Sequence, residues 1–143
     1  MPENMTVEQR RDFVAAGGRT AKIVSLRADG RPHAVPVWFV VDGDDIICTI
    51  KESSVKARNM ARDPRVTVLV DDETPPYAFV SIDGTAEISA DLEDLRRWAG
   101  AIGRRYLDDE EAVNGFVAYM TSPGSMVARI RPTHIVAMDK VAG

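Results

Sequence analysis

Two Asp-Gly dipeptides, at positions 29–30 and 42–43, constrain the first third of the chain more than any other feature. Asp-Gly favours the tight turns of β-hairpins. Here it separates three segments rich in β-branched and aromatic residues, "TAKIVSLR", "RPHAVPVWFVVD" and "DIICTI". The pattern predicts three consecutive antiparallel strands. Because proline cannot donate a hydrogen bond to a sheet, Pro32 and Pro36 put the second strand at a sheet edge or require a bulge at its beginning.

The rest of the chain divides into helices and strands by its capping residues and hydrophobic periodicity. Capping residues such as Thr6 and Asp91 open the predicted helices, and alternating valines mark the strands. The dipeptide Asp83-Gly84 is either a hairpin turn or a bulge within one long strand. The helices are predicted at residues 6–16, 53–62, 92–106 and 109–120, and the later strands at 65–71, 77–88 and 126–138. This order predicts a mainly β fold with peripheral helices around a closed antiparallel sheet.

Length and charge limit the classes of protein. The chain of 143 residues fits one domain, residues 1–143, with an N-terminal helix in 1–18 and a barrel with inserted helices in 19–138. A net charge of −4 argues against a nucleic acid or an anionic membrane as partner. The single Cys48 leaves no internal disulfide, so we expect a cytoplasmic protein. His33 and His134 lie far apart in sequence, and we expect no metal site.

A short basic segment, residues 51–66, interrupts the acidic chain. It reads "KESSVKARNMARDPRV" and holds five basic residues against two acidic ones, a local excess of three positive charges. The candidates for binding an anion are Ser53, Ser54, Lys56 and Arg58, which lie where a helix begins and where free backbone amides attract anions. The alternative is a solvated helix face, and spacing alone favours that alternative.

Three motifs in a fixed order give this segment a context: "DGRPH...PVWFV", "T...SSVKARNM.RDPRV" and "YAFV...GTAE". Together they resemble the split β-barrel flavoprotein family related to pyridoxamine 5'-phosphate oxidase. More narrowly, they are similar to its branch of flavin/deazaflavin oxidoreductases that use coenzyme F-420, an 8-hydroxy-5-deazaflavin. The resemblance runs from about Thr20 to Met138. It implies a six-stranded antiparallel split barrel that forms a homodimer, with cofactor sites between the subunits.

The resemblance also implies which residues bind the cofactor. Lys56 and Arg58 match its phosphate-binding positions, and Lys51 is a candidate for the acidic tail of the deazaflavin. A flat ring needs an apolar wall and backbone hydrogen bonds. The matching residues for the ring are Val37, Trp38, Phe39, Thr49 and Ile50, with Tyr77 and Phe79 supplied by the other subunit. Each of these ring residues is equally consistent with barrel core.

The function implied is an F-420-dependent oxidoreductase that transfers a hydride between the deazaflavin and an electron-poor small organic substrate. Because the cofactor carries the hydride, the protein needs no catalytic triad, and we assign no catalytic residue. Two alternatives stay open. One is an FMN-binding reductase or oxidase of the same fold, and the other is a cofactor-binding barrel that catalyses nothing.

Overall fold

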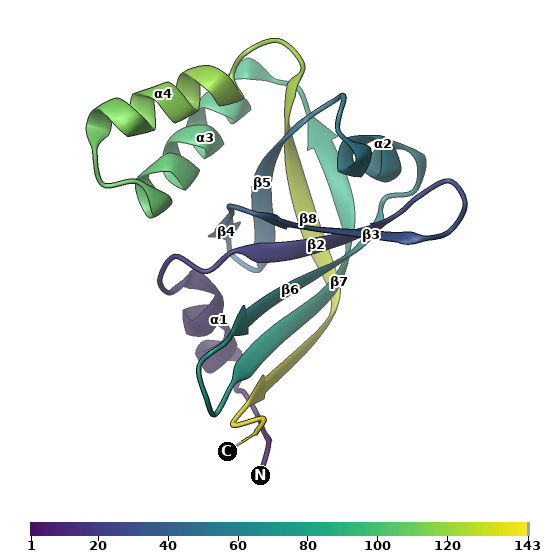
Figure 1. The fold of residues 1–143 in the computed structure, drawn as a ribbon, viewed down its shortest axis with the longest axis vertical. Coiled ribbons are helices and arrows are strands. Elements are labelled where there is room, and N and C mark those ends of the chain that lie inside the picture. Colours follow the sequence, from purple (N-terminus) through teal and green to yellow (C-terminus); the bar gives the residue numbers. More distant parts are fainter. Residues whose placement is uncertain (143) are drawn as a thin grey trace.

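The computed structural model describes residues 1–142, so Gly143, the last residue of the predicted domain, lies outside the described residues. Eight strands and four helices occupy this part of the chain (Figure 1). In chain order they are β1 (Glu3–Asn4), α1 (Val7–Ala15), β2 (Ala21–Leu26), β3 (Pro32–Val37), β4 (Val40–Asp42), β5 (Asp45–Lys51), α2 (Val55–Arg62), β6 (Arg65–Asp72), β7 (Ala78–Ser89), α3 (Leu92–Tyr106), α4 (Glu110–Met120) and β8 (Ser125–Asp139). The fold is mainly β with peripheral helices, as predicted.

The strands form one antiparallel sheet in the order β3-β2-β6-β7-β8-β5-β4, and β1 adds to β8. The predicted closed six-stranded barrel is therefore wrong: the hydrogen-bonded path is open, and its two edges are β3 and β4. The predicted second strand breaks at Trp38 and Phe39 into β3 and β4. Its first part pairs with β2 and its second part with β5, so a two-residue link and not a hydrogen-bonded ladder joins the two edges of the path. The Phe39 side chain is fully buried at this crossing.

β3 lies at an edge of the sheet, which confirms the prediction made from its two prolines. β3 pairs with β2 only. The backbone N–H of Arg27 donates to the carbonyl of Arg31, so hydrogen-bonded pairs recur at every second position along this ladder. Pro32 and Pro36 fall on the intervening positions, where the backbone nitrogen points away from β2 and needs no partner.

The Asp83-Gly84 dipeptide lies inside one long strand and not in a turn, and the extra residue of the bulge, Thr133, is on the partner strand β8. β7 continues through it as one strand, and the register against β8 shifts between Asp83 and Gly84. A Cβ atom at Gly84 would lie 2.6 Å from the carbonyl oxygen of Arg131, so only glycine lets the two backbones approach this closely. The bulge bends the long β7–β8 pair, which runs diagonally through the molecule (Figure 1).

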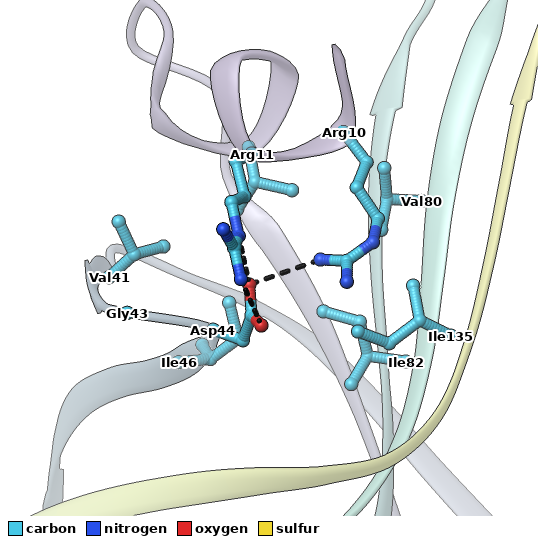
Figure 2. A pocket seen from close by; sticks show the side chains of 10 residues that line it. Arg10, Arg11, Val41, Gly43, Asp44, Ile46, Val80, Ile82 and Ile135 are labelled. Atoms are coloured by element: carbon cyan, nitrogen blue, oxygen red, sulfur yellow. Dashed lines mark hydrogen bonds and ion pairs between the residues drawn. The ribbon is translucent and has the colours of Figure 1, made fainter. Parts of the chain in front are cut away.

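Helix α1 is fixed to the β4–β5 turn by an ion-pair cluster (Figure 2). The Thr6–Gln9 capping box forms as predicted and sets the start of the helix. From this helix, Arg11 donates to both carboxylate oxygens of Asp44 at 2.9 and 3.0 Å, and Arg10 donates to one of them at 3.1 Å. The cavity beneath these arginines measures only about 20 Å³, far below the size of a cofactor site. We therefore place no cofactor beneath these arginines.

The other helices lie at separate places around the sheet (Figure 1). α2 covers one end of the barrel and buries Ala57 and Met60 in its core. α3 and α4 form a hairpin, and α3 packs Leu95 and Trp98 against Ile47 of β5. No helix within residues 1–142 is long and apolar enough to cross a membrane.

Candidate functional site

The start of helix α2 offers hydrogen-bond donors to an external acceptor. Ser54 is the N-cap: its hydroxyl oxygen accepts from the Ala57 amide at 3.2 Å, and its hydroxyl donates to the Lys51 carbonyl at 2.7 Å. The amides of Val55 and Lys56 belong to the first turn, where no helical carbonyl precedes them. Together with the dipole of the helix they favour an anion at this end. Of the two predicted caps, Ser53 and Ser54, the structure uses Ser54, so the helix begins at Val55 and ends at Arg62 as predicted.

Two cations of this segment remain without an acidic partner. None of the ion pairs among residues 1–142 involves Lys56 or Arg58. Residues two apart on a helix project about 200° from each other, so the two side chains leave opposite sides of α2. Lys56 is half-buried on the barrel side and Arg58 is exposed. Lys56 is therefore the better placed of the two for an anion held against the barrel.

The thiol of Cys48 on β5 is influenced by the charge of Lys56. Burial raises the pKa of Cys48 to about 12, and the positive charge of Lys56 opposes that rise. With so high a pKa, Cys48 stays protonated at neutral pH and serves as neither nucleophile nor metal ligand. Among the described residues, no group of three or more His, Cys, Asp or Glu side chains is placed to hold a metal ion.

Lys51, predicted as a further cofactor residue, is engaged within the chain. Its ammonium donates to the carbonyl of Tyr119 at 2.7 Å and to the hydroxyls of Ser122 and Ser125 at 2.8 and 2.6 Å. It also lies 4.3 Å from the centre of the Tyr119 ring. All three ammonium hydrogens are used, so Lys51 fastens the end of α4 to β5. It has no donor left for the tail of a cofactor.

Trp38 stands at the crossing between β3 and β4 and faces the α3–α4 hairpin. Its ring stacks on Tyr106 with centroids 4.8 Å apart and an interplanar angle of 6°, and Phe116 lies 5.4 Å away. The side chain remains 37% exposed. Val37, one residue earlier, is half-buried and packs on the barrel core. Trp38 therefore presents an aromatic surface, whereas Val37 mainly fills the core.

A polar junction holds this aromatic group in place. The Arg105 guanidinium donates to the carbonyls of Phe39, Val14 and Gly17 at 2.8, 3.0 and 3.2 Å. The neighbouring Tyr106 hydroxyl donates to the Arg19 carbonyl at 2.6 Å. Desolvation lowers the pKa of Arg105 and raises that of Tyr106. The junction joins α3 to α1 and to the β3–β4 crossing, and nothing in the sequence spacing indicated it.

Thr49 and Ile50 point to opposite faces of β5, as neighbours in a strand must. The Ile50 side chain is 1% exposed and belongs to the barrel core. Thr49 is half-buried on the same face as Ile47 and Lys51, toward the helical hairpin. Of these two predicted ring residues, only Thr49 can offer its side chain to a ligand on that face, and Ile50 can offer only its backbone.

Tyr77 and Phe79 lie at the opposite end of the sheet from α2. Phe79 pairs with Asp71 near the end of β6, whereas α2 leads into Arg65 at its beginning. Six residues of strand separate these points, which corresponds to roughly 20 Å. Tyr77 is exposed and follows the Pro75–Pro76 segment. A single chain therefore does not bring Tyr77 and Phe79 to the Lys56 end of the site.

The outward face of β2, β6, β7 and β8 carries apolar side chains that the chain leaves partly exposed. Two open hollows, of about 550 and 450 Å³, lie on it. The first includes Val24 and Leu26, and the second includes Leu69, Tyr77 and Phe79. Such a face is typical of a surface that meets another protein.

A buried polar contact under α2 escaped the sequence prediction. Asn59 and Ser25 are 3% and 1% exposed, and the Asn59 amide donates to the Ser25 hydroxyl oxygen at 3.0 Å. Asparagine is unfavourable inside a helix and costly to bury without partners. Asn59 lies between Ala57 and Met60, the two apolar residues that α2 buries, and this spacing could have predicted that Asn59 is buried too.

Similarity to known proteins covers nearly the whole chain. The family profile for pyridoxamine 5'-phosphate oxidase matches residues 7–139. A conserved hypothetical protein of Mycobacterium tuberculosis is 32% identical, with a TM-score of 0.83 over 95% of this chain and 86% of that one. An F420 reductase structure is 21% identical, with a TM-score of 0.64 over 90% of this chain and 95% of that one. An FAD-binding protein of Mesorhizobium loti is 18% identical, with a TM-score of 0.70 over 96% of each chain.

Proposed function

The chain belongs to the pyridoxamine 5'-phosphate oxidase family, and from this premise we propose that it is an oxidoreductase that binds coenzyme F-420. The observation that carries the proposal is the start of α2, where a half-buried, unpaired Lys56 accompanies the free amides of the first turn. When bound, the deazaflavin would supply the hydride for an electron-poor small organic substrate. The absence of a disulfide from a chain whose one thiol is buried supports a cytoplasmic location.

The anion site would hold the phosphodiester of the cofactor. Backbone amides of Val55 and Lys56 would donate to its oxygens, while the Lys56 ammonium neutralises its charge. The exposed hydroxyl of Ser53, just before the cap, is the nearest further donor. Arg58 leaves the other side of the helix, so it would meet an anionic group outside this pocket, such as a carboxylate of the tail.

The ring would lie along β5 toward the aromatic surface of Trp38. Thr49 lies on this face, and backbone groups near Ile50 can fix the polar edge of the ring. The stack of Trp38 on Tyr106, held by the Arg105 junction, gives a rigid apolar wall that excludes water from one side. These residues orient the ring and protect it, and no side chain is required to take part in bond making.

The other wall would come from a second copy of the chain. The apolar outward face described above suits a symmetric dimer contact, in which the same surface of each subunit meets its partner. The partner subunit's Tyr77 and the partner subunit's Phe79 would then approach the ring, which a single chain does not allow. A mass of one 15.7 kDa chain by light scattering at micromolar concentration would contradict this arrangement.

F-420 is preferred to FMN because of charge. Its tail carries several carboxylates in addition to the phosphodiester, and the segment 51–66 has an excess of basic residues in an acidic chain. The FAD-binding relative keeps a flavin as the second candidate. A titration of the purified protein with F-420 and with FMN at one salt concentration separates the two, because tighter binding of FMN would exclude the deazaflavin assignment.

Lys56→Ala tests the site itself. The loss of a charged hydrogen-bond partner is expected to weaken cofactor binding by about 1–3 kcal/mol while the protein stays folded. Arg96→Ala is the matched control, since it removes an equal charge from the exposed surface of α3. The two variants should differ clearly in cofactor affinity by calorimetry, and equal affinities would show that the anion site lies elsewhere. A cofactor that binds but is never reoxidised by any acceptor offered would indicate a binding protein and not an enzyme.

A further inference from the structure

Helix α2 is short, and its apolar contacts alone do not fix its orientation. It has eight residues, of which only Ala57 and Met60 bury apolar side chains in the barrel. Hydrophobic contact is not directional, so two small anchors leave a two-turn helix free to rotate about its axis or to slide. The donors at its N-terminus have fixed directions, and their use in binding depends on the orientation of the helix.

A directional contact is supplied by Asn59. Its amide nitrogen donates to the hydroxyl oxygen of Ser25 at 3.0 Å, and its amide oxygen accepts from Arg62 at 2.9 Å. The same guanidinium nitrogen of Arg62 donates to the carbonyl of Leu26 at 2.8 Å. Asn59 thus connects the middle of α2 to the end of β2 by a chain of hydrogen bonds, of which the bond to Ser25 is buried.

We propose that Asn59 is a positioning residue for the phosphate end of the cofactor, supported by the Ser25 hydroxyl that accepts from its amide. The inference rests on the proposed function. Asn59 lies one turn beyond Val55 and Lys56, about 5–6 Å along the helix axis, so its hydrogen bonds set the rotation of the turn that meets the phosphate. It contacts no ligand itself and acts through the helix.

The first test is Asn59→Leu, which keeps the volume and removes both hydrogen bonds. We expect F-420, or FMN if that is the ligand, to bind about tenfold more weakly, the cost of one net hydrogen bond. Ile102→Val is the matched control for stability, because it removes a methylene from the fully buried side of α3 and does not touch α2. The control should lose thermal stability and keep the affinity of the wild type.

The second test uses Ser25 and keeps the inference falsifiable if Asn59→Leu does not fold. Ser25→Ala removes the oxygen that accepts from the Asn59 amide and should weaken binding, whereas Ser25→Thr keeps the hydroxyl and should retain most of the affinity. A purely structural role would lower stability without this difference in binding. Wild-type affinity in Asn59→Leu, or equal affinities in the two Ser25 variants, would overturn the positioning role. Binding of neither cofactor by the wild-type protein would instead overturn the proposed function, and this inference with it.

Discussion

Lys51→Met separates a structural lysine from a ligand-binding one. Methionine keeps most of the aliphatic stem and removes the ammonium that joins β5 to the end of α4. Lys56→Met makes the same change five residues later in the chain, where no ion pair or hydrogen bond of the described residues engages the ammonium. The two substitutions are chemically equal, so any difference in their effects comes from their positions.

The loss of stability expected for Lys51→Met can be estimated from the contacts that each partner of Lys51 would lose. Ser125 is buried, and leaving its hydroxyl oxygen without a donor costs about 1–3 kcal/mol. The carbonyl of Tyr119 and the hydroxyl of Ser122 are more exposed and can turn to water, so they add little. Loss of the cation–π contact with the Tyr119 ring adds about 0.5 kcal/mol. The sum is roughly 2–3 kcal/mol, or a decrease of about 6–10 °C in melting temperature for a chain of this size.

Denaturant unfolding measures the stability of both variants, and cofactor titration measures their affinity. Lys51→Met should lose stability and bind the cofactor within about threefold of the wild type, a difference below 1 kcal/mol. Lys56→Met should keep its stability and lose affinity. If Lys51→Met lost affinity to the same degree as Lys56→Met with no loss of stability, Lys51 would be a ligand-binding residue, and its contacts with α4 would be irrelevant to its role.

Two further predictions concern the frame of the fold. The Arg11 contact holds the pKa of Asp44 at about 2, below its ordinary 3.8, so the stabilisation it provides is complete above about pH 4 and is lost as the pH falls through 2. Asp44→Asn should therefore lower the free energy of unfolding by about 1 kcal/mol at pH 6, a value reduced for solvent screening, and by almost nothing at pH 2; a difference that is constant with pH in urea titrations would refute this. Gly84→Ala places a Cβ atom 2.6 Å from the Arg131 carbonyl oxygen and should cost about 1–3 kcal/mol by thermal unfolding, whereas a stable variant would mean that the bulge can move.

The parts of the fold that the sequence predicted depend on neighbours in the chain. Asp29-Gly30 and Asp42-Gly43 make hairpin turns because the dipeptide itself adopts the required backbone angles. Likewise Ser54 caps α2 through an amide three residues away. Because such a signal involves only a few neighbouring residues, it can be recognised in the sequence, and it predicts both the type of an element and where it begins or ends.

The parts that it did not predict depend on distant partners. The break at Trp38 and Phe39 divides the strand between two partners, β2 and β5, and no local pattern shows that these two partners differ. Lys51 fits the pattern of an anion-binding lysine, yet its partners Tyr119 and Ser125 are 68 and 74 residues away. Two lysines five residues apart therefore look alike in sequence and differ in the structure.

The distribution of paired charges gives the strongest reason to look for a ligand at α2. Most basic side chains of residues 1–142 meet an acid or a carbonyl: Arg10, Arg11, Arg19, Lys22, Lys51, Arg62, Arg65, Arg105, Arg129, Arg131 and Lys140. A chain with an excess of acids could have paired Lys56 in the same way, and a half-buried ammonium gains more from a partner than an exposed one. Within the described residues it has none, although it lies beside the free amides of a helix start. We therefore propose that its partner comes from outside the chain and is an anion.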